Sequence, residues 1–327
     1  MSTASNSLPY TVATAGEALI DMVARPDGSF MPCLGGAVYN LTRALALQGV
    51  PTLYLNPLSS DRFGRQLTQG LRDCGVGLAC PEAVAQPTSL AMVALSESGH
   101  PDYAFYREGV ADRAITARTL VHNCAAAPGL QMVCTGALAL DPRDADVYLP
   151  WLDAQRQAGH TVVVDANLRP SVMPDLAAYR AHVHAVLQRA HVIKASDEDL
   201  AHLGLAAATP LQQARQLLEG SQAHWLALTC GADGAHLLTR AGACYSARET
   251  RPLKVADTVG AGDCFLAGLV ARWLQMGLPP AWGCDAVAPE QALSLLGHAI
   301  ASASLNVQRQ GCQPPRAQEV RAWLEGR

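Results

Sequence analysis

Short apolar runs alternate with helical stretches along this chain, and that alternation restricts the possible folds more than any other feature. The runs are not interrupted by polar residues at every second position, which is typical of strands covered on both faces. The intervening segments place apolar residues at helical spacing. An α/β fold is therefore expected, with a doubly wound, mostly parallel sheet flanked by helices. The expected strands lie within residues 11–23, 52–56, 130–136, 160–168, 191–196 and 224–231.

Two segments interrupt this alternation. Residues 14–34 contain a turn at Asp27 and Gly28 that favours a hairpin, and residues 88–107 read as two strands joined by "ESGHPD". We expect them to form a small antiparallel β lid beside the main sheet. Because no internal repeat or Pro/Ser-rich linker divides the chain, a single domain is expected over residues 1–327.

The charge balance argues against several classes of partner. The net charge is −4, and the chain contains only two lysines, Lys194 and Lys254. No basic stripe for nucleic acid is therefore expected. The chain shows neither a signal-peptide pattern nor a run of 18 apolar residues, which predicts a cytoplasmic protein without a membrane partner. The ten cysteines form no C-x-x-C pair, so they do not indicate a metal site.

The stretch "ADTVGAGDCFLAG", residues 256–268, places an acid on each side of a glycine turn. Apolar residues then recur at helical spacing, so the turn opens a helix whose first N–H groups have no helical partners. Those amides and the helix dipole form an anion hole suited to phosphoryl transfer. Asp263, at the head of the helix, can accept a proton from a hydroxyl. A purely structural alternative remains: Asp257 caps the turn and Asp263 complements the dipole.

Two ordered motifs resemble the signatures of the PfkB, or ribokinase-like, sugar kinases. "DTVGAGD" followed by "FLAGL" resembles the carboxy-terminal signature, and "GGAVYNLTRALALQG" resembles the amino-terminal one. The segments "FGRQL", "PTSLAMVAL", "FYREGVAD", "DANLRP", "LTCGADGAHL" and "VQRQGCQPP" also resemble family segments, so the similarity covers nearly the whole chain. It implies a ribokinase-like fold and an ATP-dependent kinase acting on a primary hydroxyl of a sugar.

The resemblance also implies roles for individual residues. Asp263 would be the base, and the amides of Gly260, Ala261 and Gly262 would hold the transferred phosphate. Arg107 and Arg169, two of the implied sugar-binding residues, have a structural alternative, because each can pair with a surface carboxylate instead. The implied sugar-binding residues are Asp21, Gly35, Gly36, Asn40, Tyr106, Arg107 and Arg169.

For the nucleotide, the sequence contains no P-loop motif, so ATP is expected in an open groove. The resemblance places Thr229 and Gly231 beside the ATP phosphates and ribose. Asn167 and Lys194 are expected near the path of the phosphate. Lys194 ends an apolar run, which makes a phosphate contact reasonable.

Mg²⁺ is expected as a cofactor, but the family's N-x-x-E stretch appears here as "SDED". Asp199 would then reach Mg²⁺ through water, or Glu198 would replace it. Alternatively, Ser196 and Asp199 form a capping box. The segment "NPLSS", residues 56–60, also departs from the family pattern.

A K⁺ site is a further family trait. The matching residues are Asp257 and Thr258, with backbone carbonyls near Asn306, Arg309 and Gly311.

Several segments look most like bacterial fructokinases, which implies phosphorylation of fructose at its 6-hydroxyl. 2-Keto-3-deoxygluconate kinase and (amino)riboside kinase are the alternatives, since Tyr103, Tyr106, Arg107 and Arg169 would also suit a sugar acid. A catalytically silent, sugar-responsive family member is the alternative outside the enzymes. A homodimer through the lid is expected, because an apolar sheet face needs cover.

Overall fold

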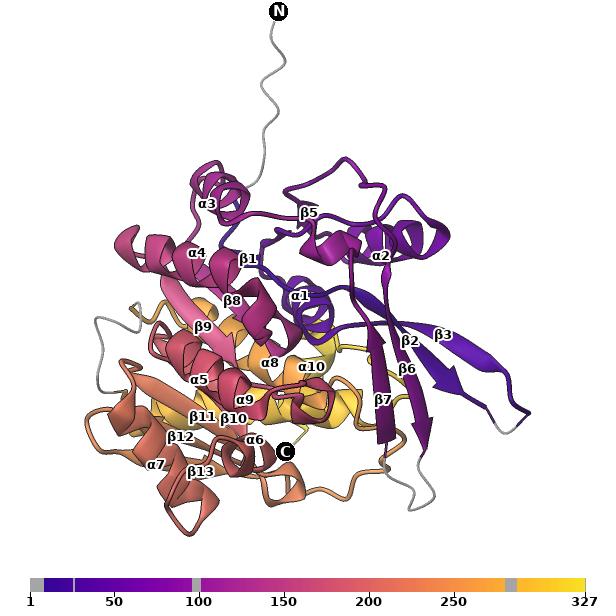
Figure 1. Ribbon diagram of the computed structural model, residues 1–327. Coiled ribbons are helices and arrows are strands. Elements are labelled where there is room, and N and C mark those ends of the chain that lie inside the picture. The colour runs from indigo at the N-terminus through magenta and orange to yellow at the C-terminus, as the bar shows by residue number, and fades with distance from the viewer. Residues whose placement is uncertain (1–8, 26, 96–100, 280–286, 327) are drawn as a thin grey trace, which may run out of the picture.

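The computed structural model describes residues 9–25, 27–95, 101–279 and 287–326. Within these residues, a nine-stranded sheet forms the centre of the molecule (Figure 1). Its strands from β11 to β5 run parallel, and β12 and β13 extend it in antiparallel fashion. The expected mostly parallel sheet is therefore confirmed. In spatial order the strands are β13 (Cys244–Ala247), β12 (Ala235–Thr239), β11 (Trp225–Thr229), β10 (Val192–Ser196), β9 (Thr161–Asp165), β8 (Met132–Gly136), β1 (Val12–Thr14), β4 (Thr52–Tyr54) and β5 (Gly77–Leu78).

Helices cover both faces of this sheet. Successive strand residues point to opposite faces, so Val12 packs with one group of helices and Ala13 with the other. The first face is covered by α1 (Ala37–Leu47), α8 (Ala261–Gln275) and α9 (Pro289–Asn306). The second face is covered by α3 (Ala117–Ala125), α4 (Ala145–Gln157), α5 (Leu176–Leu187), α6 (Asp197–His202) and α7 (Pro210–Gly220).

The remaining α-helices in the described ranges are α2 (Arg62–Asp73) and α10 (Ala317–Glu325). Helix starts follow local chemistry: the Asp61 side chain accepts a hydrogen bond from Gly64 N at the start of α2, and Asp175 caps α5 in the same way. None of the helices in the described ranges combines the length and apolar character needed to cross a membrane.

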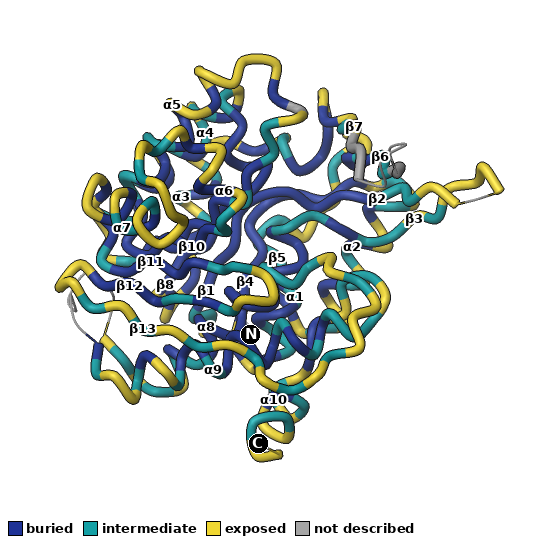
Figure 2. Tube along the Cα trace, turned by 90° about the horizontal axis from the view of Figure 1, so that it is seen from below, coloured by how far each residue is buried: buried dark blue, intermediate teal, exposed yellow. Residues whose placement is uncertain are grey.

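A second sheet of four strands projects from the body as the lid (Figure 1). The order is β3 (Phe30–Gly35), β2 (Leu19–Ala24), β6 (Ser89–Leu95) and β7 (Pro101–Tyr106). Both hairpins expected from the sequence are present, although residues 96–100 of the second connection lie outside the described residues. The two hairpins are antiparallel, whereas β2 and β6 pair in parallel. Figure 2 shows that the far end of the β2–β3 hairpin is exposed, while its base is buried.

One expected strand is divided between the two sheets. The apolar run at 11–23 supplies β1 to the main sheet and β2 to the lid, with a sharp turn between them at Gly16. Gly16 has φ +155°, and a Cβ there would lie 2.9 Å from Cβ of Val38, so a side chain does not fit. The turn at Gly16 carries the chain from the main sheet into the lid.

Candidate active site

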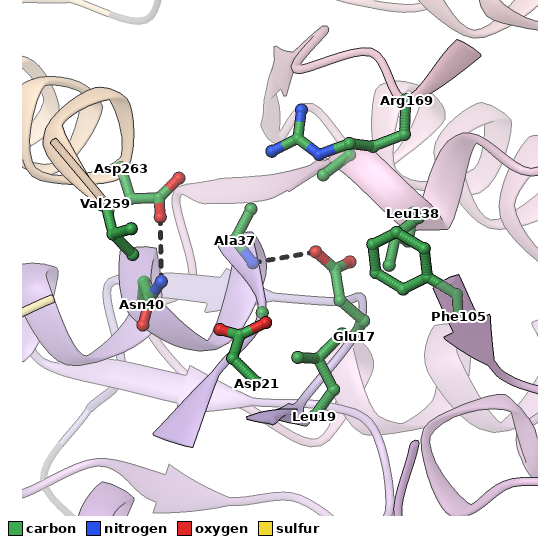
Figure 3. A pocket seen from close by; sticks show the side chains of 13 residues that line it. Glu17, Leu19, Asp21, Ala37, Asn40, Phe105, Leu138, Arg169, Val259 and Asp263 are labelled. Carbon is green, nitrogen blue, oxygen red and sulfur yellow. Dashed lines mark hydrogen bonds between the residues drawn. The ribbon is translucent and has the colours of Figure 1, made fainter. Parts of the chain in front are cut away.

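A pocket of about 130 Å³ lies between the lid and the carboxyl ends of the central strands (Figure 3). This is the edge at which open α/β sheets place their ligands. Residues from six separate segments of the chain converge on it. The lining residues are Glu17, Leu19, Asp21, Gly36, Ala37, Asn40, Phe105, Ala137, Leu138, Arg169, Val259, Gly260 and Asp263.

The glycine turn opens α8 as the sequence predicts. Gly260 is the residue before the helix and has φ +75°, a left-handed conformation that favours glycine. A Cβ on Gly260 would overlap Sγ of Cys312. Within the turn, Ala261 N–H donates to the Thr258 carbonyl at 3.1 Å. A Cβ on Gly262 would lie 2.8 Å from Nζ of Lys194, so this ammonium group lies directly against the turn.

Asp263 lies at the floor of the pocket and is only 6% exposed. Its Oδ2 accepts a hydrogen bond of 3.1 Å from Nδ2 of Asn40 on α1. Burial and the neighbouring Asp165 raise the pKa of Asp263 to about 7, although Lys194 and Asn40 act in the opposite direction. A carboxylate with such a pKa is matched to taking a proton at neutral pH.

A buried ion pair between Lys194 and Asp165 lies near Asp263 and influences its pKa. Nζ of Lys194 lies 3.0 Å from Oδ1 of Asp165, and both side chains are almost fully buried. Burial raises the pKa of Asp165 to about 6, while Lys194 lowers it. The sequence reasoning did not single out Asp165, although an acid that ends an otherwise apolar strand was an available signal.

Four of the predicted sugar-binding positions line the pocket: Asp21, Gly36, Asn40 and Arg169. Burial raises the pKa of Asp21 to about 6, and Arg169 opposes this. Gly35 lies behind them, and a Cβ there would overlap Oδ2 of Asp21. Position 35 therefore needs glycine for close packing against Asp21.

The two predicted lid residues are not brought into this pocket. Tyr106 is 63% exposed and lines a second, larger cavity, to which Phe105 also contributes. Arg107 also lines that second cavity, and its guanidinium bonds Asp112 at 3.0 Å and the Leu138 carbonyl at 3.2 Å. From β7, the residue that does line the main pocket is Phe105.

Asp199 forms the capping box that its sequence context allowed. Its Oδ2 accepts hydrogen bonds from the N–H and hydroxyl of Ser196, each at 2.8 Å. Its Oδ1 accepts a bond of 2.6 Å from Leu168 N. Both carboxylate oxygens therefore hold protein donors, and they fix the loop that carries Asn167, whose φ is +38°. In the described part of the chain, no three His, Cys, Asp or Glu side chains gather closely enough to hold a metal alone.

Two of the predicted nucleotide residues lie away from the main pocket. Thr229 ends β11, directly opposite Ser196 at the end of β10. Gly231 follows with φ +52°, in the turn before β12. They share the carboxyl edge of the sheet with Asp165, which ends β9, and with Lys194, which lies in β10.

The two loops of the expected K⁺ site lie together. The Asp257 Oδ2 accepts hydrogen bonds from Gly311 N at 2.9 Å and Gln310 Nε2 at 3.1 Å. Its Oδ1 accepts from Val259 N. Asn306 is fully buried, and its side chain joins the two loops by donating to the Val259 carbonyl at 2.8 Å. Thr258 and Arg309 lie within these same loops.

The structure also explains the unusual "NPLSS" segment. Asn56 is buried, and its Oδ1 accepts a 2.9 Å hydrogen bond from Gly16 N. Its Nδ2 donates to the Asp112 carbonyl at 2.8 Å and contacts the Tyr148 hydroxyl at 3.1 Å. Asn56 thus ties the turn between the two sheets to the segment that follows the lid.

The pocket also contains residues that sequence reasoning missed. Ala137 has φ +51°, a strained conformation for a residue with a side chain, and such strain often accompanies binding sites. Glu17 is an acid inside an apolar run, a signal that the sequence did contain. The missed lining residues are Glu17, Leu19, Ala37, Phe105, Ala137, Leu138 and Val259.

Comparisons with known proteins identify the family of this chain. Residues 11–319 match the family model described as "pfkB family carbohydrate kinase". A fructokinase of Rhizobium leguminosarum bv. trifolii is 32% identical over 272 residues, covering 80% of this chain and 78% of that protein. A fructokinase of Salmonella typhimurium is 29% identical, covering 86% and 88%. The crystal structure of the Xylella fastidiosa fructokinase with bound ATP superposes with a TM-score of 0.82 at 28% identity, covering 98% of this chain and 99% of that one.

Proposed function

The chain belongs to the pfkB family of carbohydrate kinases, and from that premise we propose that it phosphorylates fructose at the 6-hydroxyl with Mg·ATP as the donor. That it is an ATP-dependent sugar kinase follows from the family match and from the kinases it resembles in sequence and structure. The observation that carries the proposed mechanism is the position of Asp263. This acid lies at the floor of a polar pocket, at the start of α8 and near Lys194.

In the proposed reaction, the sugar hydroxyl loses its proton to the Asp263 carboxylate as its oxygen forms a bond to the γ-phosphorus. The bond from that phosphorus to the bridging oxygen breaks, and ADP leaves. A base with a pKa of about 7 can take the proton at neutral pH and release it to water afterwards. Phosphoryl transfer otherwise depends on positioning and charge stabilisation.

The turn before α8 would supply part of that stabilisation. The helix dipole and the amides at Gly260 and Gly262 favour negative charge at this point. The ammonium group of Lys194 adds a fixed positive charge beside the same turn. Because Lys194 is buried and paired with Asp165, its position is set before substrate binds.

Magnesium would enter with ATP, whose phosphates and waters are its usual ligands. The carboxylate oxygens of Asp165 lie at the correct edge of the sheet and have the chemistry that Mg²⁺ prefers. Asp199 would act indirectly, because both of its oxygens already accept protein hydrogen bonds. Bound magnesium would neutralise charge on the phosphates.

Fructose is the substrate that the relatives favour, since those with 29–32% identity are fructokinases. Asp21 and Asn40 would bind its hydroxyls, and Oδ1 of Asn40 is buried without a partner in the described structure. A sugar acid is disfavoured because Arg107 is paired with Asp112 rather than directed into the pocket. Arg169 alone would then face the carboxylate.

The nucleotide is proposed to lie along the carboxyl edge of the sheet, between Asn167 and the segment from Thr229 to Gly231. The joined loops around Asp257 and Gly311 are proposed to hold K⁺ through their carbonyl oxygens. A homodimer through the lid also stays a prediction, with β3 and β7 as the lid's outer strands. A catalytically silent role is disfavoured because the acid, the turn and the buried ion pair all occur together.

The test is ADP release from Mg·ATP by the purified protein. Fructose, 2-keto-3-deoxygluconate, ribose and aminoimidazole riboside are compared at equal concentration, each with and without K⁺. A clear preference for fructose supports the proposal. Preference for another sugar overturns fructose as the substrate. Release with none of them leaves either an untested sugar or the silent alternative, and ATP binding measured by calorimetry separates these two, because absence of ATP binding favours the silent alternative.

A further inference from the structure

Glu17 places an unpartnered carboxylate oxygen in the main pocket. The residue lies in the turn between β1 and β2 and is only 1% exposed. Its Oε1 accepts a hydrogen bond of 2.9 Å from Ala37 N, the first amide of α1. Its Oε2 is buried and has no hydrogen-bond partner within the described structure. Glu17 therefore uses one oxygen to hold the fold and leaves the other oxygen free.

A free buried oxygen of this kind is costly. An unsatisfied buried polar atom destabilises a protein, and more so when the group is charged. Arg107 lowers the pKa of Glu17, but its guanidinium bonds Asp112 and the Leu138 carbonyl rather than Oε2 of Glu17. The carboxylate of Asp112 also opposes the effect of Arg107 on Glu17. Since Glu17 lines a pocket, a ligand can supply the missing partner.

The place of Glu17 in the pocket indicates which part of a sugar it would meet. In Figure 3, Asp263 and Asn40 lie on one side, whereas Glu17 lies on the other, close to Phe105 and Leu138. Asp21 lies between these two ends. A sugar with its accepting hydroxyl at Asp263 would therefore extend its far end toward Glu17.

We propose that Glu17 determines sugar specificity by hydrogen bonding, through Oε2, a hydroxyl at the end of the sugar remote from the phosphorylated one. This inference rests on the proposed function, because it uses the sugar orientation set by Asp263. Oε1 keeps its bond to Ala37 N throughout, so a single side chain holds the start of α1 and reads the sugar. Burial raises the pKa of Glu17 to about 7, which lets the carboxyl group accept or donate near neutral pH.

The informative variant is Glu17→Gln. The amide oxygen can still accept from Ala37 N, but an NH₂ group replaces Oε2. We expect the KM for sugar to rise about 10-fold or more, while kcat and the KM for ATP stay within about 3-fold. The matched control is Glu108→Gln, which makes the same chemical change on a lid side chain that is 90% exposed.

A cycle between protein and substrate separates recognition from a structural effect. Analogues of the sugar, each lacking one hydroxyl other than the phosphorylated one, are compared in wild type and Glu17→Gln. For one remote hydroxyl, removal should raise KM in wild type and have little further effect in the variant. Additive effects for every hydroxyl, or an unchanged sugar KM in the variant, would overturn the role of Glu17.

The outcomes distinguish this inference from the proposed function. If wild type phosphorylates no sugar, the proposed function fails and the inference fails with it. If wild type is active and Glu17→Gln behaves like Glu108→Gln, only the inference fails. Should Glu17→Gln not fold, Glu17→Asp keeps the charge but shortens the side chain by one methylene. It should raise the same sugar KM, and an unchanged KM in that variant also contradicts the inference.

Discussion

The amide of Asn40 donates a 3.1 Å hydrogen bond to the carboxylate of Asp263, although 223 residues separate them in the chain. This bond joins the two sequence motifs on which the kinase interpretation rests. It fixes the Asp263 carboxylate at the pocket floor, and it leaves Oδ1 of Asn40 without a partner in the described structure. The base and a sugar-binding group are thus held by the same contact.

The turn before α8 should tolerate no side chain at Gly260. Gly260→Ala places a Cβ against Sγ of Cys312 and strains a residue with φ +75°. Because the turn then shifts, we expect kcat to fall by about 10²–10³-fold, as for loss of an oxyanion-hole donor. Steady-state kinetics measures this change.

Gly277→Ala is the matched control for that variant. Gly277 has φ +60° at the other end of α8, with open space around it. The substitution should cost about 1 kcal/mol of stability and leave kcat unchanged. Equal kcat values in the two variants would show that the turn before α8 has no special role.

The charge of Lys194 should set the pH range of catalysis. In wild type, kcat/KM should fall as the pH drops below about 7, because protonated Asp263 cannot accept a proton. Lys194 lowers the pKa of Asp263, so Lys194→Met should move this acid limb to higher pH. A pH profile of kcat/KM measures the movement, and the exposed Lys254→Met serves as control.

Removing Lys194 should also destabilise the protein. The variant leaves Asp165 buried without its partner, which typically costs about 3–5 kcal/mol. Adding Asp165→Asn should recover much of that loss, as measured by denaturant unfolding. If Lys194→Met alone were as stable as wild type, the ion pair would not contribute to stability.

Asn56 should matter for stability more than its place in a loop indicates. Asn56→Ala leaves Gly16 N and the Asp112 carbonyl without partners in a buried region. We expect a loss of about 2–4 kcal/mol in the free energy of unfolding. Asn123→Ala is the control, because that half-buried amide bonds only a thiol in the described structure, and it should cost far less.

The architecture was largely predictable, since buried parallel strands give continuous apolar runs that can be recognised from the sequence. The main error of the prediction concerned residues 11–23, which read as one strand but form two. The turn that divides them is held by contacts from elsewhere in the chain, among them the hydrogen bond from Gly16 N to Asn56 Oδ1 and the close approach of Val38 to Gly16. The local spacing of apolar residues does not reveal such contacts.

The candidate site was predictable where short motifs concentrate its chemistry, as around Asp263. It was less predictable where side-chain direction decides. Phe105 and Tyr106 are adjacent, yet only Phe105 lines the main pocket. Glu17 and Asp165 were missed because their roles depend on burial and on partners from other segments.

Burial of Asp263 should have a cost in stability that depends on pH. The pKa of Asp263 rises from 3.8 to about 7 on folding, so the folded state binds the proton more tightly. This contribution to stability is complete below pH 4 and is lost as the pH rises through 7. Asp263→Asn should therefore stabilise the protein by about 2–4 kcal/mol at pH 8, and by little at pH 4. Thermal unfolding at the two pH values measures the difference.

The most direct test of the mechanism compares kcat and sugar affinity in Asp263→Asn and wild type. Asparagine keeps the size of the side chain and can still accept from Asn40, but it cannot take the proton. The proposed mechanism predicts that kcat falls by about 10²–10⁴-fold, while the sugar Kd from calorimetry changes by less than about 5-fold. Turnover by Asp263→Asn at the wild-type rate would contradict the assignment of Asp263 as the base.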